Sequence, residues 1–258
     1  MSFELGQFLF SLGVSCGLMA IVWFATRFRV PESLEVDFAH PRKEAAIAVG
    51  YVVGLFLMIA VAFFFLQPSS RTSANGSRQF DLWGALRQWA VYAVISLVPI
   101  SVLIRVRRQR FETVGVTSKN LRGSVAVGIL MSIVFVLVYL AATPKWSLNR
   151  LLSANALFGF IYFLAVGVGE ELMFRGFLQI RCTLWLGEIR GLILASVIMA
   201  FVHLPQRIFV AGLSPLPALV SAASLLPFSF LMGLMMLRTN NILGSSILHT
   251  VVNWVSVL

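Results

Sequence analysis

Apolar stretches long enough to cross a lipid bilayer recur along this chain of 258 residues. Hydrophobic residues make up 59% of it and charged residues only 12%, which excludes an ordinary soluble domain. One helical span needs about 20 apolar residues, so the chain has room for about eight spans. We therefore expect an all-α fold, a polytopic membrane helical bundle of about eight transmembrane helices. A single transmembrane domain should cover residues 1–258, with N-terminal helices in 1–150 and the helices that carry polar motifs in 151–258.

The net charge of +10 would suggest nucleic-acid binding in a soluble chain, but here the basic residues lie mostly between the apolar segments. In such connections they set the topology and contact lipid headgroups, so the lipid bilayer is the expected partner and nucleic acid is not. Ten of the twenty Lys and Arg residues lie in the first and third connections, and four lie in the second and fourth. The positive-inside rule therefore predicts cytoplasmic odd-numbered connections and an N-terminus outside the cell.

Three charged residues, Glu170, Glu171 and Arg175, interrupt one of the late apolar stretches. Charge is expensive at bilayer depth, so a functional site is the first hypothesis for such a cluster. On an α-helix Glu171 and Arg175 lie one turn apart and can pair, whereas Glu170 lies about 100° away round the axis. This geometry predicts that Arg175 holds Glu171 and that Glu170 is free for chemistry. The alternative is a buried ion-pair cluster that only joins helices.

His203, His249 and Asn253 are further polar residues in the late apolar segments. His249 and Asn253 are four residues apart, so both face the same neighbour on a helix. A single histidine on an apolar helix is more often a satisfied core residue. Two such segments beside a charged third point instead to a shared site, because each unsatisfied polar group in lipid costs several kcal/mol.

These residues resemble the motifs of the CPBP intramembrane proteases, a family that includes the eukaryotic prenyl-CaaX endoproteases and many bacterial relatives. The family pattern is EExxxR, then FxxxH, then HxxxN on successive membrane helices. The first and third motifs are complete here, and the second has Met199 in place of its Phe. The resemblance covers residues 152–258 and implies an eight-helix fold with a polar cavity. It also implies a multi-pass protein of a bacterial or archaeal cell membrane that cleaves a membrane-associated peptide or protein.

The resemblance also implies a role for each motif residue. It assigns activation of water to Glu170 and His203, stabilisation of the oxyanion to His249 and Asn253, and a bracing role to Glu171 and Arg175. Peptide hydrolysis needs a base for the water, donors for the oxyanion and a proton for the leaving amine. This set of side chains can supply all three.

Metal dependence and other functions stay open on the sequence. Glu170, His203 and His249 could form a zinc set with one open position. No cofactor is favoured, because Asn253 beside His249 looks more like a pair of oxyanion donors than a pair of ligands. A catalytically inactive membrane scaffold or immunity protein is one alternative, and a proton-coupled transporter is another. The sequence does not predict the oligomeric state.

Two segments are expected to depart from straight spans. The stretch 152–187 would reach about 54 Å as one α-helix, well beyond a bilayer, so it must break, tilt or run along the interface. Pro99 is expected to kink the third span, because proline lacks the N–H that a helix interior needs.

Overall fold

The computed structural model describes residues 2–27, 36–66, 79–142 and 151–257, with side chains from residue 12 onward. Within these ranges the chain is helical and contains no strand. The α-helices are α1 (Ser2–Thr26), α2 (Pro41–Leu66), α3 (Leu82–Tyr92), α4 (Val98–Val106), α5 (Leu121–Ala142), α7 (Ala154–Glu171), α8 (Ile180–Leu186), α9 (Glu188–Phe201), α10 (Pro215–Ala223), α11 (Leu226–Thr239) and α12 (Leu243–Val255). Shorter segments join some of them: the π-helical η1 (Ala93–Leu97), η3 (Leu172–Gln179) and η4 (Gln206–Val210), and the 3-10 turn η2 (Phe111–Val114).

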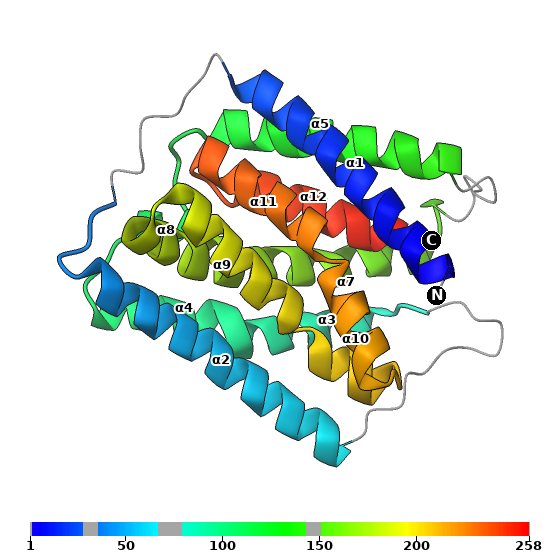
Figure 1. Ribbon diagram of the computed structural model, residues 1–258, viewed down its shortest axis with the longest axis horizontal. Coiled ribbons are helices and arrows are strands. Elements are labelled where there is room, and N and C mark those ends of the chain that lie inside the picture. Colours follow the sequence, from blue (N-terminus) through cyan, green and yellow to red (C-terminus); the bar gives the residue numbers. More distant parts are fainter. Residues whose placement is uncertain (1, 28–35, 67–78, 143–150, 258) are drawn as a thin grey trace.

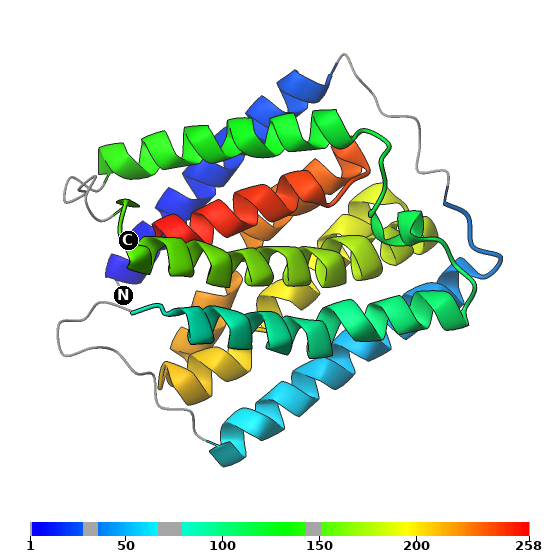
Figure 2. The same cartoon turned by 180° about the vertical axis from the view of Figure 1, so that it is seen from behind.

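Six continuous helical segments of the described residues are long and apolar enough to cross a membrane. They are Pro41–Phe65, Leu82–Val106, Leu121–Ala142, Ala154–Leu186, Glu188–Val210 and Pro215–Thr239. With α1 and α12 beside them, the predicted bundle of about eight membrane helices is confirmed. The start of α1 and the end of α12 lie at the same end of the bundle, as an even number of crossings requires (Figures 1 and 2). Which end faces the cytoplasm stays a prediction.

The last helix, α12, lies inside the bundle and packs mainly on α5 and α7 (Figure 2). Glycines allow this close approach. A Cβ on Gly128 of α5 would lie 2.6 Å from the carbonyl oxygen of Gly244, and one on Gly167 of α7 would lie 2.4 Å from Oγ1 of Thr250. Small-residue contacts of this kind are typical of membrane helices, which pack by van der Waals contact rather than by the hydrophobic effect. They bring His249 of α12 against the acidic end of α7.

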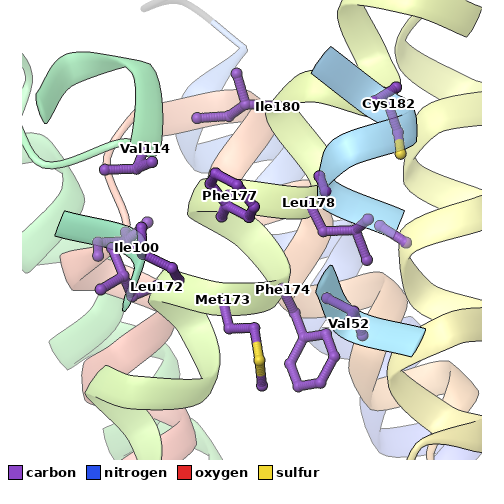
Figure 3. Close-up of a cluster of buried hydrophobic side chains, with 14 of the residues drawn as sticks. Val52, Ile100, Val114, Leu172, Met173, Phe174, Phe177, Leu178, Ile180 and Cys182 are labelled. Carbon is purple, nitrogen blue, oxygen red and sulfur yellow. The ribbon is translucent and has the colours of Figure 1, made fainter. Parts of the chain in front are cut away.

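The stretch that is too long for one straight span is a continuous helical path, Ala154–Leu186, that changes type in its middle. The helix does not break within this stretch, although a break was one of the expected outcomes. The chain changes direction only at Gly187, which adopts a φ of 85°. A π-helix has more residues per turn than an α-helix, so η3 shortens the path. All eight residues of η3 are buried, and its apolar side chains pack against Val52 of α2, Ile100 of α4 and Val114 of η2 (Figure 3).

The third span contains the π-helical segment η1, which ends two residues before Pro99. Because Pro99 has no N–H, the carbonyl of Ile95 lacks its α-helical partner. The hydroxyl of Tyr51 on α2 donates to that carbonyl instead. In place of a simple kink at Pro99, the helix is therefore widened to a π-helix, and a side chain of the neighbouring helix α2 bonds the carbonyl that Pro99 leaves free.

A second group of buried charges, which the sequence reasoning did not single out, surrounds Arg181 of α8. Arg181 donates to the carbonyl of Thr113 over 3.1 Å and to Oε1 of Gln109 over 2.7 Å. Its Nε lies 3.6 Å from Oε2 of Glu44 on α2, and Arg107 pairs with the other oxygen of Glu44. We call Glu44, Arg107 and Arg181 the Arg181 cluster. It fastens the start of α2 and the connection after α4 to α8.

Candidate active site

The adjacent acids Glu170 and Glu171 end α7 and face different neighbours. The Tyr92 hydroxyl donates to Oε1 of Glu170 over 2.6 Å. The other oxygen, Oε2, lies 3.9 Å from Nε2 of His203 and 3.7 Å from Nε2 of His249. The Glu170 side chain is 12% exposed, whereas Glu171 is fully buried. Glu170 therefore presents one carboxylate oxygen to two imidazoles and is less deeply buried than Glu171.

His203 follows α9, in the turn before η4. Its Nδ1 lies 2.8 Å from the carbonyl oxygen of Met199. A carbonyl only accepts, so we assign the hydrogen to Nδ1, which leaves a lone pair on Nε2. Nε2 and the carboxylate oxygen of Glu170 are then two acceptors that face each other at 3.9 Å, too far apart for a direct hydrogen bond. A donor between them can bond to both.

His249 of α12 is held by Glu171. Its Nδ1 lies 2.9 Å from Oε1 of Glu171, and the His249 side chain is 5% exposed. The edge-to-face contact with the Phe228 ring, at 5.7 Å between centroids, fixes the imidazole from α11. These contacts orient Nε2 of His249 toward Glu170.

Glu171 and Arg175 form the ion pair that their spacing predicts. Nε of Arg175 lies 3.4 Å from Oε2 of Glu171, and both side chains are fully buried. Arg175 also donates to the Ser229 hydroxyl on α11 over 3.0 Å. The pair thus links η3 to α11 and, through His249, to α12. An ion pair that only joins helices would account for Glu171 and Arg175 but not for the placement of Glu170.

Asn253 lies one turn after His249 on α12 and is half-buried. Across the described part of the chain, its amide makes no hydrogen bond with the other five motif residues. The structure therefore brings Glu170, Glu171, Arg175, His203 and His249 into one connected group and leaves Asn253 beside it.

Tyr92, which bonds Glu170, was missed by the sequence reasoning. It ends α3 and reaches Glu170 because the residue before Glu170 is glycine: a Cβ on Gly169 would lie 2.2 Å from Cδ1 of Tyr92. The Ser96 hydroxyl donates to the Gly169 carbonyl over 2.7 Å, which holds the same two helices together. The available signal was a tyrosine inside an apolar span, since a buried tyrosine hydroxyl usually has a polar partner.

The residues that could form a zinc set, Glu170, His203 and His249, lie near one another, but no group of three His, Cys, Asp or Glu among the described residues is arranged to hold a metal ion. Their chemistry suits zinc, and the second nitrogen of each imidazole is fixed by a carbonyl or a carboxylate, as in many metal sites. Bonds of about 2.0–2.1 Å in a tetrahedral zinc site hold the ligand atoms about 3.3–3.4 Å apart. The separations from Glu170 Oε2 to the two nitrogens, 3.9 and 3.7 Å, are a few tenths of an ångström wider than that.

The fold and this group of side chains define a class of protein: a multi-pass helical membrane protein with a buried carboxylate–histidine site. Residues 152–255, the part of the chain that carries the motifs, match the family model Rce1-like, described as Type II CAAX prenyl endopeptidase Rce1-like. The match contains all the motif residues and confirms the resemblance inferred from them. The match supports a CAAX-type intramembrane protease at the level of the family. Neither curated proteins nor solved structures gave a match.

Proposed function

We propose that this protein is an endopeptidase that hydrolyses a peptide bond of a membrane-associated protein or peptide, using a water molecule activated by Glu170 and His203. One observation carries the proposal: Oε2 of Glu170 and Nε2 of His203 are acceptors that face each other at 3.9 Å. A water that donates one hydrogen to each directs its lone pairs toward a substrate carbonyl. The family match supports peptide hydrolysis as the reaction.

The proposed reaction begins when the water oxygen bonds to the scissile carbonyl carbon and Glu170 takes the proton. The carbonyl oxygen becomes an oxyanion. When the C–N bond breaks, the proton now on Glu170 passes to the leaving amine and the carboxylate is restored. The hydrogen bond from Tyr92 to Oε1 keeps Oε2 as the oxygen that handles this proton.

His249 and Asn253 are the proposed donors to the oxyanion. His249 already donates from Nδ1 to Glu171, so donation from Nε2 requires the imidazolium form, which carries hydrogens on both nitrogens. The Glu171 carboxylate, 2.9 Å away, is the counter-ion that such a cation needs inside a membrane. Asn253 would turn its amide toward the oxyanion only when substrate is bound, since apo geometry is often looser than that of the reacting complex.

We propose that the reaction proceeds without a metal ion. The separations around Glu170 Oε2, wider than tetrahedral zinc ligation requires, support a hydrogen-bonded water at this position. The purified protein should then carry no stoichiometric zinc and keep its activity in strong chelators. One zinc per chain, lost together with activity and restored on adding the metal back, would reverse this assignment.

The central test is turnover of a membrane-linked peptide by Glu170→Gln, which keeps the shape of the side chain and removes its basicity. We expect a folded protein without activity. Glu188→Gln, at the exposed start of α9, is the matched control and should be fully active. Normal turnover by Glu170→Gln would contradict hydrolysis at this site. Absence of turnover in the unmodified protein would favour the scaffold or the proton-coupled transporter.

A further inference from the structure

A cavity of about 590 Å³ lies where α1 ends, α5 begins and α11 ends, and these three helix ends meet at the upper left of Figure 1. Its volume is within the range of small-ligand sites. It shares no residue with the candidate active site. Its lining consists of Ala25, Thr26, Ser118, Asn120, Leu121, Arg122, Gly123, Ser124, Ala126, Val127, Leu130, Arg238 and Thr239.

Two charged residues, Arg122 and Arg238, are among the described residues that line this cavity, and both are positive. None of the described lining residues is acidic. Within the described ranges, neither arginine forms an ion pair. The guanidinium of Arg238 lies 3.8 Å over the ring of Trp23, and such stacking leaves its edge N–H groups free to bind an anion.

The helix ends at the cavity do not cancel this charge. Two helix C-termini contribute about −0.5 each and one N-terminus contributes about +0.5, against two full positive charges. The cavity is therefore suited to an anion.

The surroundings place this anion site at the edge of the hydrocarbon core. It lies at the ends of two predicted membrane spans, Leu121–Ala142 and Pro215–Thr239. Trp23 is 50% exposed, and tryptophan is typical of the membrane–water interface. Leu121 and Leu130, also in the lining, are 39% and 42% exposed. A ligand here has its charged part at headgroup level and its apolar part along α5.

We propose that this cavity binds one anionic phospholipid. The phosphate lies between Arg122 and Arg238, and the acyl chains follow Val127 and Leu130 along α5. Charge complementarity selects a lipid with net negative charge, such as phosphatidylglycerol, over the zwitterionic phosphatidylcholine.

Native mass spectrometry of the whole protein, released from mixed micelles with either phosphatidylglycerol or phosphatidylcholine, tests the proposal without measuring proteolysis. The protein should retain phosphatidylglycerol in preference to phosphatidylcholine. Arg122→Gln and Arg238→Gln should each lower that retention about fivefold, since one basic residue near a membrane surface contributes about that much to binding of anionic lipid. Arg105→Gln, an exposed arginine at the end of α4 and outside the cavity, should not change it.

A second variant tests the contribution of the cavity volume separately from that of the two positive charges. A Cβ on Gly123 would meet no atom within 4 Å, so Gly123→Leu can fill the cavity while both arginines remain. We expect it to lower phosphatidylglycerol retention as well. Unchanged retention in Gly123→Leu, or equal losses in Arg105→Gln and Arg238→Gln, would show that the lipid binds by general surface charge and would overturn the site. Equal retention of both lipids by the unmodified protein would overturn it too.

Discussion

The candidate active site and the Arg181 cluster are both buried groups of charge on one helical path, but they are built differently. In the Arg181 cluster, each charge faces an opposite charge or an acceptor, and the side chains of Arg181 and Glu44 are only 1% and 8% exposed. In the active site, Glu170 and His203 are 12% and 19% exposed, and their facing atoms are both acceptors. Buried charge alone therefore does not mark a reactive centre. The two facing acceptors, Glu170 and His203, are the feature on which the proposed activation of water rests.

The largest expected effect lies in the active site. Glu170→Ala and His203→Ala should each bring turnover of a membrane-linked peptide near background, because general-base assistance contributes about 100- to 10,000-fold. If both act on one water, the double variant should be scarcely slower than either single variant. If the double variant instead loses the product of the two single losses in turnover, Glu170 and His203 act independently. That result would contradict their action on one shared water.

The Arg181 cluster should respond in stability rather than in activity. Glu44→Gln leaves Arg107 and Arg181 without their carboxylate, and breaking a buried ion pair commonly costs about 3–5 kcal/mol of unfolding free energy. Turnover per folded molecule should stay normal. Glu112→Gln is the matched control, because its pair with Arg110 is largely exposed and worth at most about 1 kcal/mol. The two variants are compared by denaturant unfolding in micelles, with turnover measured on the same samples. A Glu44→Gln variant that is stable but inactive would show that the Arg181 cluster acts in catalysis and not in stability.

A smaller effect is expected at Asn253, which the structure leaves beside the connected group. Asn253→Ala should lower turnover about 100- to 1,000-fold, as is typical for loss of one oxyanion donor, and should leave the unfolding transition unchanged. The variant should therefore be slow but measurable, above Glu170→Ala. If Asn253→Ala has full turnover, the oxyanion is stabilised by other groups and Asn253 belongs to the scaffold.

The smallest effect should be at Tyr92, which orients Glu170 without contacting the reacting atoms. Tyr92→Phe removes one hydrogen bond to a charged carboxylate, worth about 1.5–3 kcal/mol, so turnover should fall about 10- to 150-fold. Tyr139→Phe, whose ring stacks on Phe135 in α5, is the control and should be neutral. If Tyr92→Phe has unchanged turnover but binds substrate more weakly, the role of Tyr92 is to bind substrate and not to position Glu170.

The sequence could predict contacts between residues of one helix but not contacts between residues of different helices. Apolar segment length predicted the membrane bundle, and the four-residue spacing predicted the pair of Glu171 with Arg175, now seen at 3.4 Å. The contact of Tyr92 with Glu170 joins residues 78 positions apart, and no local pattern encodes it. The Arg181 cluster was missed for the same reason, since Glu44 lies on a distant helix.

The three π-helical segments were also beyond local sequence reasoning. Each begins within three residues of a side chain of the active site: η1 after Tyr92, η3 after Glu171 and η4 shortly after His203. Such segments are frequent at functional sites, yet η3 contains neither proline nor any other residue that predicts a wider helix. Its conformation comes from the packing of its eight buried residues against neighbouring helices, which only the assembled bundle provides.

The π-helical turns of η3 also set the rotational phase between the two charge clusters. Residues of an α-helix follow one another by about 100° round the axis, and those of a π-helix by less, so η3 decides which face Arg181 occupies relative to Glu170. If the eight residues of Leu172–Gln179 took α-geometry at unchanged length, everything beyond them would be rotated about the helix axis. Glu170 and Arg181 could then no longer meet their partners at the same time. The wider turns of η3 thus place residues of one continuous helix in both charge clusters.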